Sequence, residues 1–285
     1  MEFYHLRSFV VVAKTANLTL AAKQLCTTPP AISAHIKALE DELQTVLFIR
    51  SSKGMKLTEK GEILLSKAQN TLDSVTSLVN LAVNSQHEIM GTFHLAINQS
   101  PQQLKITCLV ENMRQNTPGI NLQITSMATG KIIEAVRDGT LDGGYIYGDI
   151  PDDLFNLMIK QQQITTIAPY DFILSDNIIN QSNWVTMGYY CPFDDFLKSK
   201  IGNNILSVMS SDDESSRLEL VKSGLGLSFY EQEEAQIYVD KKEISIISDL
   251  DFDTPLYFVV AKKRTDDPVI KTILQEIRVL WNITF

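Results

Sequence analysis

Residues 17–40 read NLTLAAKQLCTTPPAISAHIKALE, and this stretch predicts two helices that meet at a tight turn. The first covers 19–25, with Thr19 as a candidate N-cap and two alanines that permit close approach of another helix. Thr28 is a good cap for the second, because the proline after it lacks an N–H that would have had no partner there. Along the second helix, apolar residues recur at spacings of four, three and four, which indicates a buried stripe of Ile32, Ile36, Leu39 and Leu43.

The elements on either side extend this pair into a winged helix-turn-helix. Before it, a further helical face carries Phe3, Leu6, Val10 and Ala13. After it, residues 50–56 form a short turn with three cations and no acid, and Leu57 returns to the core. A cationic wing beside a recognition helix is a common device for gripping phosphates. It favours a DNA-reading face over an ordinary solvated helix face for Ser33, Ala34 and Lys37, with His35 to one side.

Composition and charge limit the classes of protein that fit. The chain of 285 residues is 44% hydrophobic and 21% charged, which suits two or three globular domains and excludes a disordered or collagen-like chain. Its net charge of −9 argues at first against nucleic acid. Residues 1–60, however, hold eight Lys/Arg against five Asp/Glu, whereas residues 91–285 hold 16 against 26. A basic N-terminal module attached to an acidic remainder is therefore expected.

Residues 61–90 predict a linking helix. Apolar residues repeat there at three, four, three, four and three, in the manner of a coiled-coil seam: Leu65, Ala68, Leu72, Val75, Val79 and Ala82. We interpret it as a dimerising helix rather than one packed only on its own domain.

The acidic remainder predicts an α/β fold. Strands and helices alternate from Gly91 to Tyr147, which favours a parallel sheet with covering helices, and a second α/β unit follows Lys160. Ser100, Pro101 and Gln103 form a capping-box pattern for a helix that starts at 101. Ser100 and Thr129 follow the first two strands, at the sheet edge where ligands bind near helix N-termini.

Several motifs together resemble the DNA-binding domain of LysR-type transcriptional regulators. They occur in order between residues 17 and 61: Asn17-Leu18-Thr19-Leu20-Ala21-Ala22, Pro30-Ala31-Ile32-Ser33, Leu47-Phe48-x-Arg50 and Leu57-Thr58-x-x-Gly61. Three positions depart from the family pattern: Pro29 and Ala34, where polar readers are common, and Gln44, where a glycine usually closes the recognition helix. Weaker motifs extend the resemblance over nearly all of the chain.

The resemblance implies a fold and a division into domains. A mainly α winged helix-turn-helix (1–60) and a linker or dimerisation helix (61–90) precede an effector-binding regulatory domain (91–285). That domain is expected to be a hinged pair of Rossmann-like subdomains of the periplasmic-binding-protein type. The first comprises 91–161 and 263–285, and the second comprises 162–262.

The implied function is sequence-specific transcriptional regulation in which a small effector changes the arrangement of the DNA-binding heads. The expected partners are double-stranded DNA, the effector and further copies in a homodimer or homotetramer. The expected DNA-binding residues are Thr28, Pro30, Ser33, His35, Lys37, Arg50, Lys53 and Lys56. The expected effector-binding residues are Ser100, Gln102, Thr129, Tyr147 and Tyr189. Because acids outnumber cations near these segments, we expect a small ligand held by backbone N–H and hydroxyl groups rather than a multiply charged anion.

Two alternative functions stay open, a small-solute-binding protein and a redox-sensing regulator that uses Cys191. The three cysteines, at 26, 108 and 191, match neither a disulfide framework nor a zinc site. No Ser/His/Asp or Cys/His arrangement stands out, so we expect no enzyme, no metal and no cofactor. The N-terminus shows no secretion signal and no apolar run long enough to span a membrane, which predicts a cytoplasmic protein without membrane contact.

Overall fold

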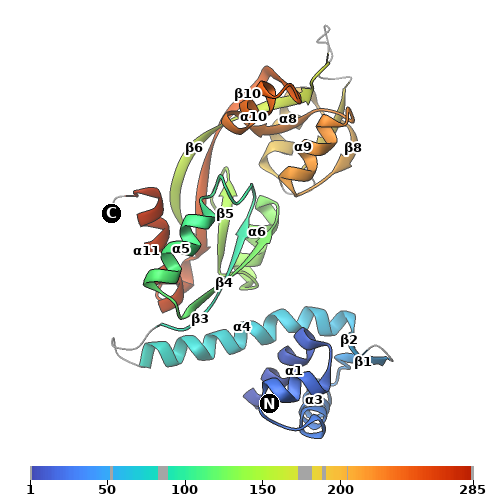
Figure 1. Ribbon diagram of the computed structural model, residues 1–285, viewed down its shortest axis with the longest axis vertical. Helices are drawn as coiled ribbons and strands as arrows, with labels where there is room; N and C mark the ends of the chain where they lie inside the picture. Colours follow the sequence, from blue (N-terminus) through green and yellow to red (C-terminus); the bar gives the residue numbers. More distant parts are fainter. Residues whose placement is uncertain are drawn as a thin grey trace. The chain divides into compact units, whose positions relative to one another are not determined.

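The structure is a computed structural model that describes residues 2–51, 54–82, 89–172, 182–187, 191–203 and 205–283. The chain forms two compact units, Met1–Gly91 and Thr92–Phe285, here named the head and the regulatory unit (Figure 1). Among the described residues, no helix has both the length and the apolar character needed to cross a membrane.

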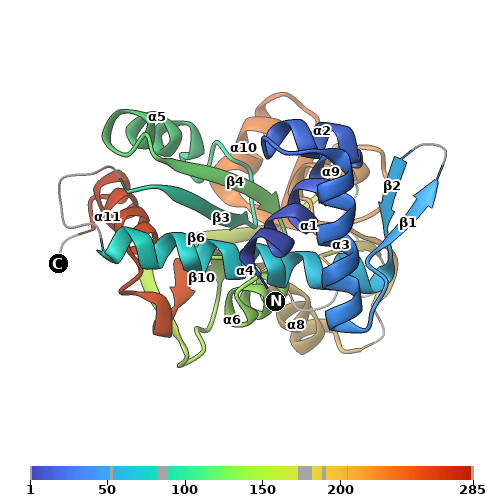
Figure 2. The ribbon, with the colours of Figure 1, turned by 90° about the horizontal axis from the view of Figure 1, so that it is seen from below.

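The head is a winged helix-turn-helix followed by a long helix. Figure 2 shows α1, α2 and α3 grouped together, with the β1–β2 hairpin extending to one side. The elements are α1 (Phe3–Thr15), α2 (Leu18–Gln24), α3 (Pro29–Leu43), β1 (Phe48–Ser51), β2 (Gly54–Leu57) and α4 (Glu59–Ala82). The antiparallel hairpin of β1 and β2 is the predicted wing.

Side-chain caps define the turn between α2 and α3. Thr19 is not the cap of α2, because Asn17 Oδ1 accepts the N–H groups of Thr19 (2.8 Å) and Leu20 (3.1 Å). Thr28 caps α3 as predicted, since its hydroxyl accepts the N–H of Ala31 at 3.4 Å. At the other end Gln44 has φ 51°, a left-handed conformation that favours glycine.

The core of the head joins all its helices to the wing. Phe3 and Leu43, expected on apolar helix faces, are 58% and 38% exposed because each lies at a helix end. The buried apolar residues are Leu6, Phe9, Val10, Val12, Ala21, Ala22, Ile32, Ile36, Leu39, Leu47, Phe48 and Ala68.

The seam of α4 divides into two parts. Its first part packs on the head, where Ala68 is buried and Leu65 and Leu72 lie against the same core. Further along, Val79 is 53% exposed. The side chain of Ala82 lies outside the described residues. Packing on its own domain therefore accounts for only the first half of the seam.

The regulatory unit alternates strands and helices. It contains β3 (Gly91–Ile97), α5 (Ile106–Asn116), β4 (Ile120–Ser126), α6 (Thr129–Asp138), β5 (Gly143–Tyr147), β6 (Leu154–Pro169), β7 (Asn183–Thr186), α8 (Pro192–Ile201), β8 (Leu206–Ser210), α9 (Glu214–Lys222), β9 (Ser228–Glu231), α10 (Gln232–Asp240), β10 (Ile244–Ala261) and α11 (Pro268–Trp281). A 3-10 turn, Lys262–Arg264, joins the last two.

Two long strands, β6 and β10, connect the halves of this unit. The main sheet has the order β4-β3-β5-β10-β6-β9, and β7 pairs in parallel with β8. In Figure 1, β6 and β10 run side by side from the part with β5 to the part with α8, α9 and α10. Leu256–Val260 pair with β5. The chain therefore returns to the first subdomain within β10, earlier than the boundary expected after residue 262.

The helix expected from the capping-box pattern begins later than predicted. Residues 101–105 form turns and α5 begins at Ile106, because Lys105 takes a left-handed conformation with φ 52°. Ser100 Oγ still accepts the N–H of Gln103 at 3.4 Å. The local hydroxyl bond predicted from the sequence is thus present without the helix.

Candidate nucleic-acid interface and regulatory pocket

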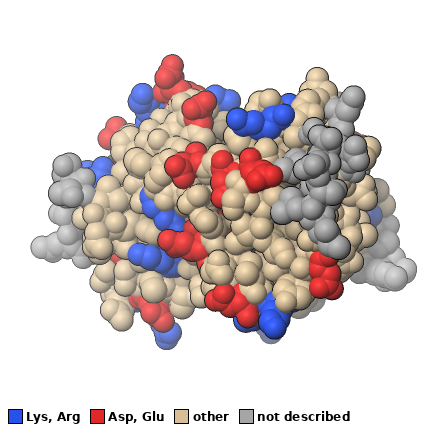
Figure 3. Space-filling view, turned by 90° about the horizontal axis from the view of Figure 1, so that it is seen from above, with Lys and Arg blue, Asp and Glu red and all other residues tan. Residues whose placement is uncertain are grey.

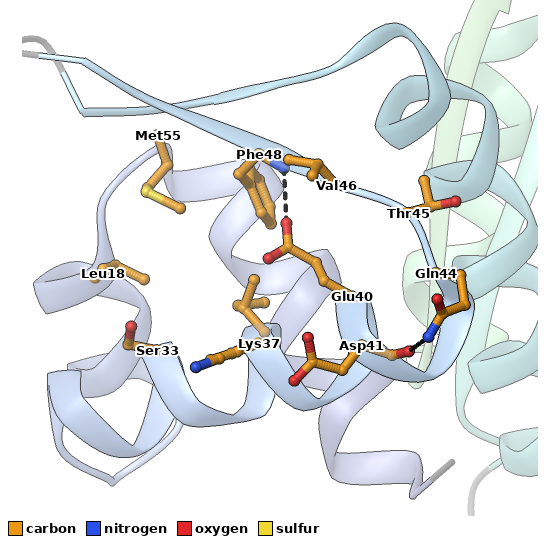
Figure 4. Close-up of a pocket in the computed structure, with 11 residues that line it drawn as sticks. Leu18, Ser33, Lys37, Glu40, Asp41, Gln44, Thr45, Val46, Phe48 and Met55 are labelled. Carbon is orange, nitrogen blue, oxygen red and sulfur yellow. Dashed lines mark hydrogen bonds between the residues drawn. The ribbon is translucent and has the colours of Figure 1, made fainter.

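A groove of about 510 Å³ lies between the recognition helix α3 and the wing (Figure 4). Two of the expected DNA-binding residues, Ser33 and Lys37, lie one helical turn apart in it. The groove is lined by Leu18, Ser33, Ile36, Lys37, Glu40, Asp41, Gln44, Thr45, Val46, Phe48 and Met55.

Three further expected DNA-binding residues are described at the start of α3 and on the wing. Thr28 and Pro30 are exposed at the N-terminus of α3. Lys56 is exposed on β2, paired in register with Ile49. The side chain of Arg50 and the whole of Lys53 lie outside the described residues.

The remaining one, His35, packs against α1 and does not line the groove. Its Nδ1 lies 2.8 Å from Ser8 Oγ, and its ring contacts Tyr4 and His5 at 4.8 and 5.6 Å between centroids. Burial, with a smaller effect of His5, lowers the pKa of His35. These contacts indicate a neutral packing residue in this position.

Glu40 has a role in the groove that the sequence did not predict. Its Oε1 accepts the N–H groups of Leu47 (2.7 Å) and Phe48 (3.2 Å), which fixes the entry to the wing (Figure 4). The partners lie seven and eight residues further along the chain. Glu40 and its two partners lie on opposite sides of a turn, where neither helical nor strand periodicity applies. The sequence pattern therefore gave no indication of this contact.

In the regulatory unit, a second pocket forms where β3 and β5 of the first subdomain meet α9 and β9 of the second. Its cavity holds about 20 Å³, which is room for about one water-sized group. It is lined by Asn98, Ala128, Thr129, Tyr147, Ile164, Met187, Cys191, Phe193, Asp212, Glu214, Arg217, Phe229, Tyr230 and Glu231.

Two of the five expected effector-binding residues line this regulatory pocket. Thr129 and Tyr147 are buried, and Thr129 Oγ1 accepts the N–H of Tyr147 at 3.2 Å and lies 3.5 Å from Asn98 Nδ2. Gln102 is exposed on the turn before α5 and does not line the pocket. Tyr189 lies outside the described residues.

Ser100 meets the pocket through its backbone rather than its hydroxyl. Its N–H donates to Glu214 Oε2 at 3.1 Å, across 114 positions of sequence. Two further contacts also join the subdomains: Lys131 Nζ to Asp212 Oδ2 at 2.5 Å, and the rings of Tyr147 and Phe193 at 4.7 Å. The pocket is therefore closed by direct contacts between its two walls.

The charged residues of the pocket were not proposed from the sequence as effector-binding groups. Glu214, Arg217 and Glu231 are 7%, 4% and 4% exposed. Burial raises the pKa of Glu214 to about 7, an effect that Arg217 and the Ser100 N–H partly oppose. Each of these residues belongs to an ordinary amphipathic or capping pattern, so only the folded arrangement brings them together.

Cys191 lines the pocket but has the wrong environment for a redox sensor. Its Sγ contacts Met187 Sδ at 3.6 Å, and burial raises the pKa of the thiol to about 12. A sensing thiol needs a lowered pKa and access to oxidant. Within the described parts of the chain, no three His, Cys, Asp or Glu side chains are grouped to hold a metal ion.

The surface of the regulatory unit reflects its acidic composition. Figure 3 shows the end that carries α8, α9 and α10, where Asp and Glu side chains gather near the middle of the face, with Lys and Arg around and between them. The described residues on this face form no continuous basic surface of the kind that binds nucleic acid.

Comparison with known proteins identifies both units. Residues 3–62 match the model described as "Bacterial regulatory helix-turn-helix protein, lysR family". Residues 86–281 match the model described as "LysR substrate binding domain". The transcriptional regulator ClcR of Pseudomonas putida is 33% identical over 146 residues, which cover 51% of this chain and 49% of that protein. The uncharacterized regulator YnfL of Escherichia coli K12 is 22% identical over 95% of this chain and 96% of its own.

Solved structures share the fold. ArgP from Mycobacterium tuberculosis superposes with a TM-score of 0.65 at 17% identity, covering 99% of this chain and 97% of its own. Full-length CbnR in complex with its target DNA gives a TM-score of 0.62 at 19% identity, covering 98% and 99%.

Proposed function

The chain belongs to the lysR family of bacterial regulatory helix-turn-helix proteins, and from this premise we propose that it regulates transcription by binding double-stranded DNA through the head and a small effector in the regulatory pocket. The observation that supports DNA binding most directly is the groove between α3 and the wing, with Ser33 and Lys37 inside it and Lys56 exposed nearby on β2. Small and basic groups on a recognition helix fit a major groove, and wing cations fit the flanking phosphates.

The effector role is supported by the position of the regulatory pocket. It lies between two subdomains joined by β6 and β10, and residues from both close it. A ligand bound there makes contacts that differ between the closed and open arrangements, which is the physical requirement for regulation.

Pairing of two chains through α4 completes the proposal. The outer part of α4 exposes Leu78 (66%) and Val79 (53%), which a second copy of the helix would cover. A two-fold dimer presents two heads to two half-sites of DNA.

Selection of genomic DNA fragments by the purified full chain tests the DNA-binding role. We expect enrichment of fragments that share two similarly spaced half-sites. Lys37→Ala should lose this enrichment, whereas Lys241→Ala, which removes an exposed cation of the regulatory unit, should keep it. Recovery of the input pool unchanged by the parent protein would contradict the proposal.

A further inference from the structure

The described lining of the regulatory pocket contains more buried negative than positive charge. Glu214 and Glu231 face a single buried cation, Arg217, which gives its Nη1 donor to the Ser211 carbonyl oxygen at 2.9 Å. The third acid in the lining, Asp212, is paired with Lys131 from the first subdomain. A carboxylate removed from water without a matching cation is costly, and either a proton or a bound cation can relieve that cost.

Two polar atoms in the same lining have no hydrogen-bond partner. They are Asn98 Oδ1, an acceptor, and Arg217 Nε, a donor. Both residues are more than nine-tenths buried, at 9% and 4% exposed. Buried polar atoms are nearly always paired in folded proteins, so these two indicate groups that a ligand supplies. The ligand would donate a hydrogen bond at one end and accept one at the other.

Four aromatic residues form part of the remaining walls of the pocket. Tyr147, Phe193, Phe229 and Tyr230 all belong to the lining. Aromatic faces attract organic cations, and the attraction is strongest where water is excluded. The aromatic rings and the excess of carboxylates thus both favour a positively charged ligand.

We propose that the regulatory pocket binds a small organic ammonium ion that also carries a neutral hydrogen-bond acceptor such as a hydroxyl group. The ammonium group lies between Glu214 and Asn98 Oδ1, and the acceptor meets Arg217 Nε. The inference rests on the proposed effector role of this pocket and adds the chemical class of the effector.

A carboxylate effector is disfavoured by an internal competitor. The Ser100 N–H, at the carboxyl end of β3, would be a natural donor to an anionic ligand, but the Glu214 carboxylate already accepts it at 3.1 Å. An added anion would also meet Glu231 within the same lining. Because the cavity holds about 20 Å³, an ammonium ion of several heavy atoms enters only when the two subdomains part.

Three small probes of similar size and different charge test the class of ligand. They are ethanolamine, glycolate and ethylene glycol, each titrated into the full chain near neutral pH at constant ionic strength while thermal unfolding is followed. We expect ethanolamine alone to raise the melting temperature with saturation. Glu214→Gln should weaken its apparent affinity by about tenfold or more, because it removes one partner of a buried charge pair.

Two further variants make the result specific. Glu219→Gln removes a carboxylate that is 70% exposed on the same helix, α9, and should leave the ethanolamine response unchanged. Asn98→Asp puts a charge at the orphaned acceptor and should strengthen ethanolamine binding, so it tests the proposal even where Glu214→Gln does not fold.

Each opposing outcome overturns the ammonium assignment. A response to glycolate instead of ethanolamine would do so and would leave the pocket as an effector site for another class. So would no response to any probe, or an ethanolamine response that survives Glu214→Gln and is unchanged in Asn98→Asp. The selection of DNA fragments described above decides the regulatory role independently of these results.

Discussion

Single acidic side chains build the head as well as shape its surface. Glu40 and Asp41 are neighbours on α3 and both line the groove, but only the Glu40 carboxylate bonds to the backbone of the wing strand. The N–H groups of Leu47, just before β1, and of Phe48, at its start, both donate to this carboxylate. The groove therefore keeps its form through a residue that itself adds negative charge next to the proposed DNA site.

Glu40→Ala should lower the stability of the head by about 1–3 kcal/mol, because it leaves the N–H groups of Leu47 and Phe48 without their acceptor. Asp41→Ala makes the same change in charge one residue further along and should lower the stability of the head much less. Thermal melts of the two variants provide the measurement. Equal destabilisation would show that the charge, rather than the wing contact, is responsible.

Cys191 should resist modification in the folded protein. Its pKa of about 12 leaves almost no thiolate near neutral pH, and its side chain is buried. Cys26 and Cys108 are exposed and serve as internal controls. Brief alkylation followed by mass spectrometry should label those two and spare Cys191 until denaturant is added. Rapid native labelling of Cys191 would restore the redox-sensing alternative.

Glu214 should make stability depend on pH. Burial raises its pKa from 4.5 to about 7, with Glu234 and Glu231 adding to the rise and Arg217 and the Ser100 N–H opposing it. Between these values the folded chain holds a proton that the unfolded chain has released. The free energy of unfolding therefore falls as pH rises through this window, by about 3 kcal/mol for the shift given.

Urea unfolding at pH 5 and pH 8 measures this effect. Glu214→Gln should remove the fall that the parent shows, and Glu219→Gln should retain it. The prediction fails if parent and Glu214→Gln lose the same free energy over this range.

At the scale of elements, α4 serves two surfaces in succession. Its first turns complete the core of the head through Ala68, Leu65 and Leu72. Its later turns expose Leu78 and Val79. Packing on its own domain thus accounts for the first part of the helix, and pairing with another chain is our proposal for the second part.

Charges placed on the outer seam should separate the proposed dimer. Val75→Asp with Val79→Asp puts two carboxylates into the proposed contact, where they are desolvated and repel their copies. Asn70→Asp with Ser74→Asp adds the same charge to the other side of the helix and is the control. Light scattering should report a lower mass for the first pair only. An unchanged mass for the first pair rejects the outer seam as the contact.

The wing should contribute affinity without sequence preference. Lys56→Ala should weaken binding to all DNA and reduce the slope of log affinity against log salt by about 1, the value for one phosphate contact. Lys241→Ala is the control for loss of a cation elsewhere. Titrations at several salt concentrations with an unchanged slope would exclude Lys56 from the phosphate contacts.

Local chemistry explains which elements the sequence predicted. Thr28 followed by proline correctly placed the start of α3, because cap and ring act within one turn. The similar pattern at Ser100 misplaced α5, because the left-handed Lys105 interrupts the chain before the helix begins. Among the residues that line the pocket, Thr129 and Tyr147 could be proposed from the sequence because they lie near the ends of predicted strands. Glu214 could not, since its hydrogen-bond partner, the Ser100 N–H, comes from a distant segment.

At the scale of the whole chain, the regulatory unit is organised around strands that serve both subdomains. β10 lies between β5 and β6 in the sheet, and its two halves belong to different subdomains. Register shifts interrupt its ladder with β6 between Ile247 and Phe252 and between Leu256 and Tyr257. A strand bends locally at such irregularities, so we expect any opening of the proposed effector pocket to use these positions.

The late position of β10 in the sequence also affects how the protein is made. On the ribosome, the head has its whole core once α4 has emerged, whereas β5, already beside β3, lacks its second neighbour until residues 256–260 are synthesised. At about 5–20 residues per second, this delay is on the order of ten to thirty seconds. During this delay the head of the nascent chain can already fold, while the edge of β5 that later pairs with β10 is unpaired. A chain that stops before β10 would therefore leave a folded head attached to a regulatory unit without its central strand.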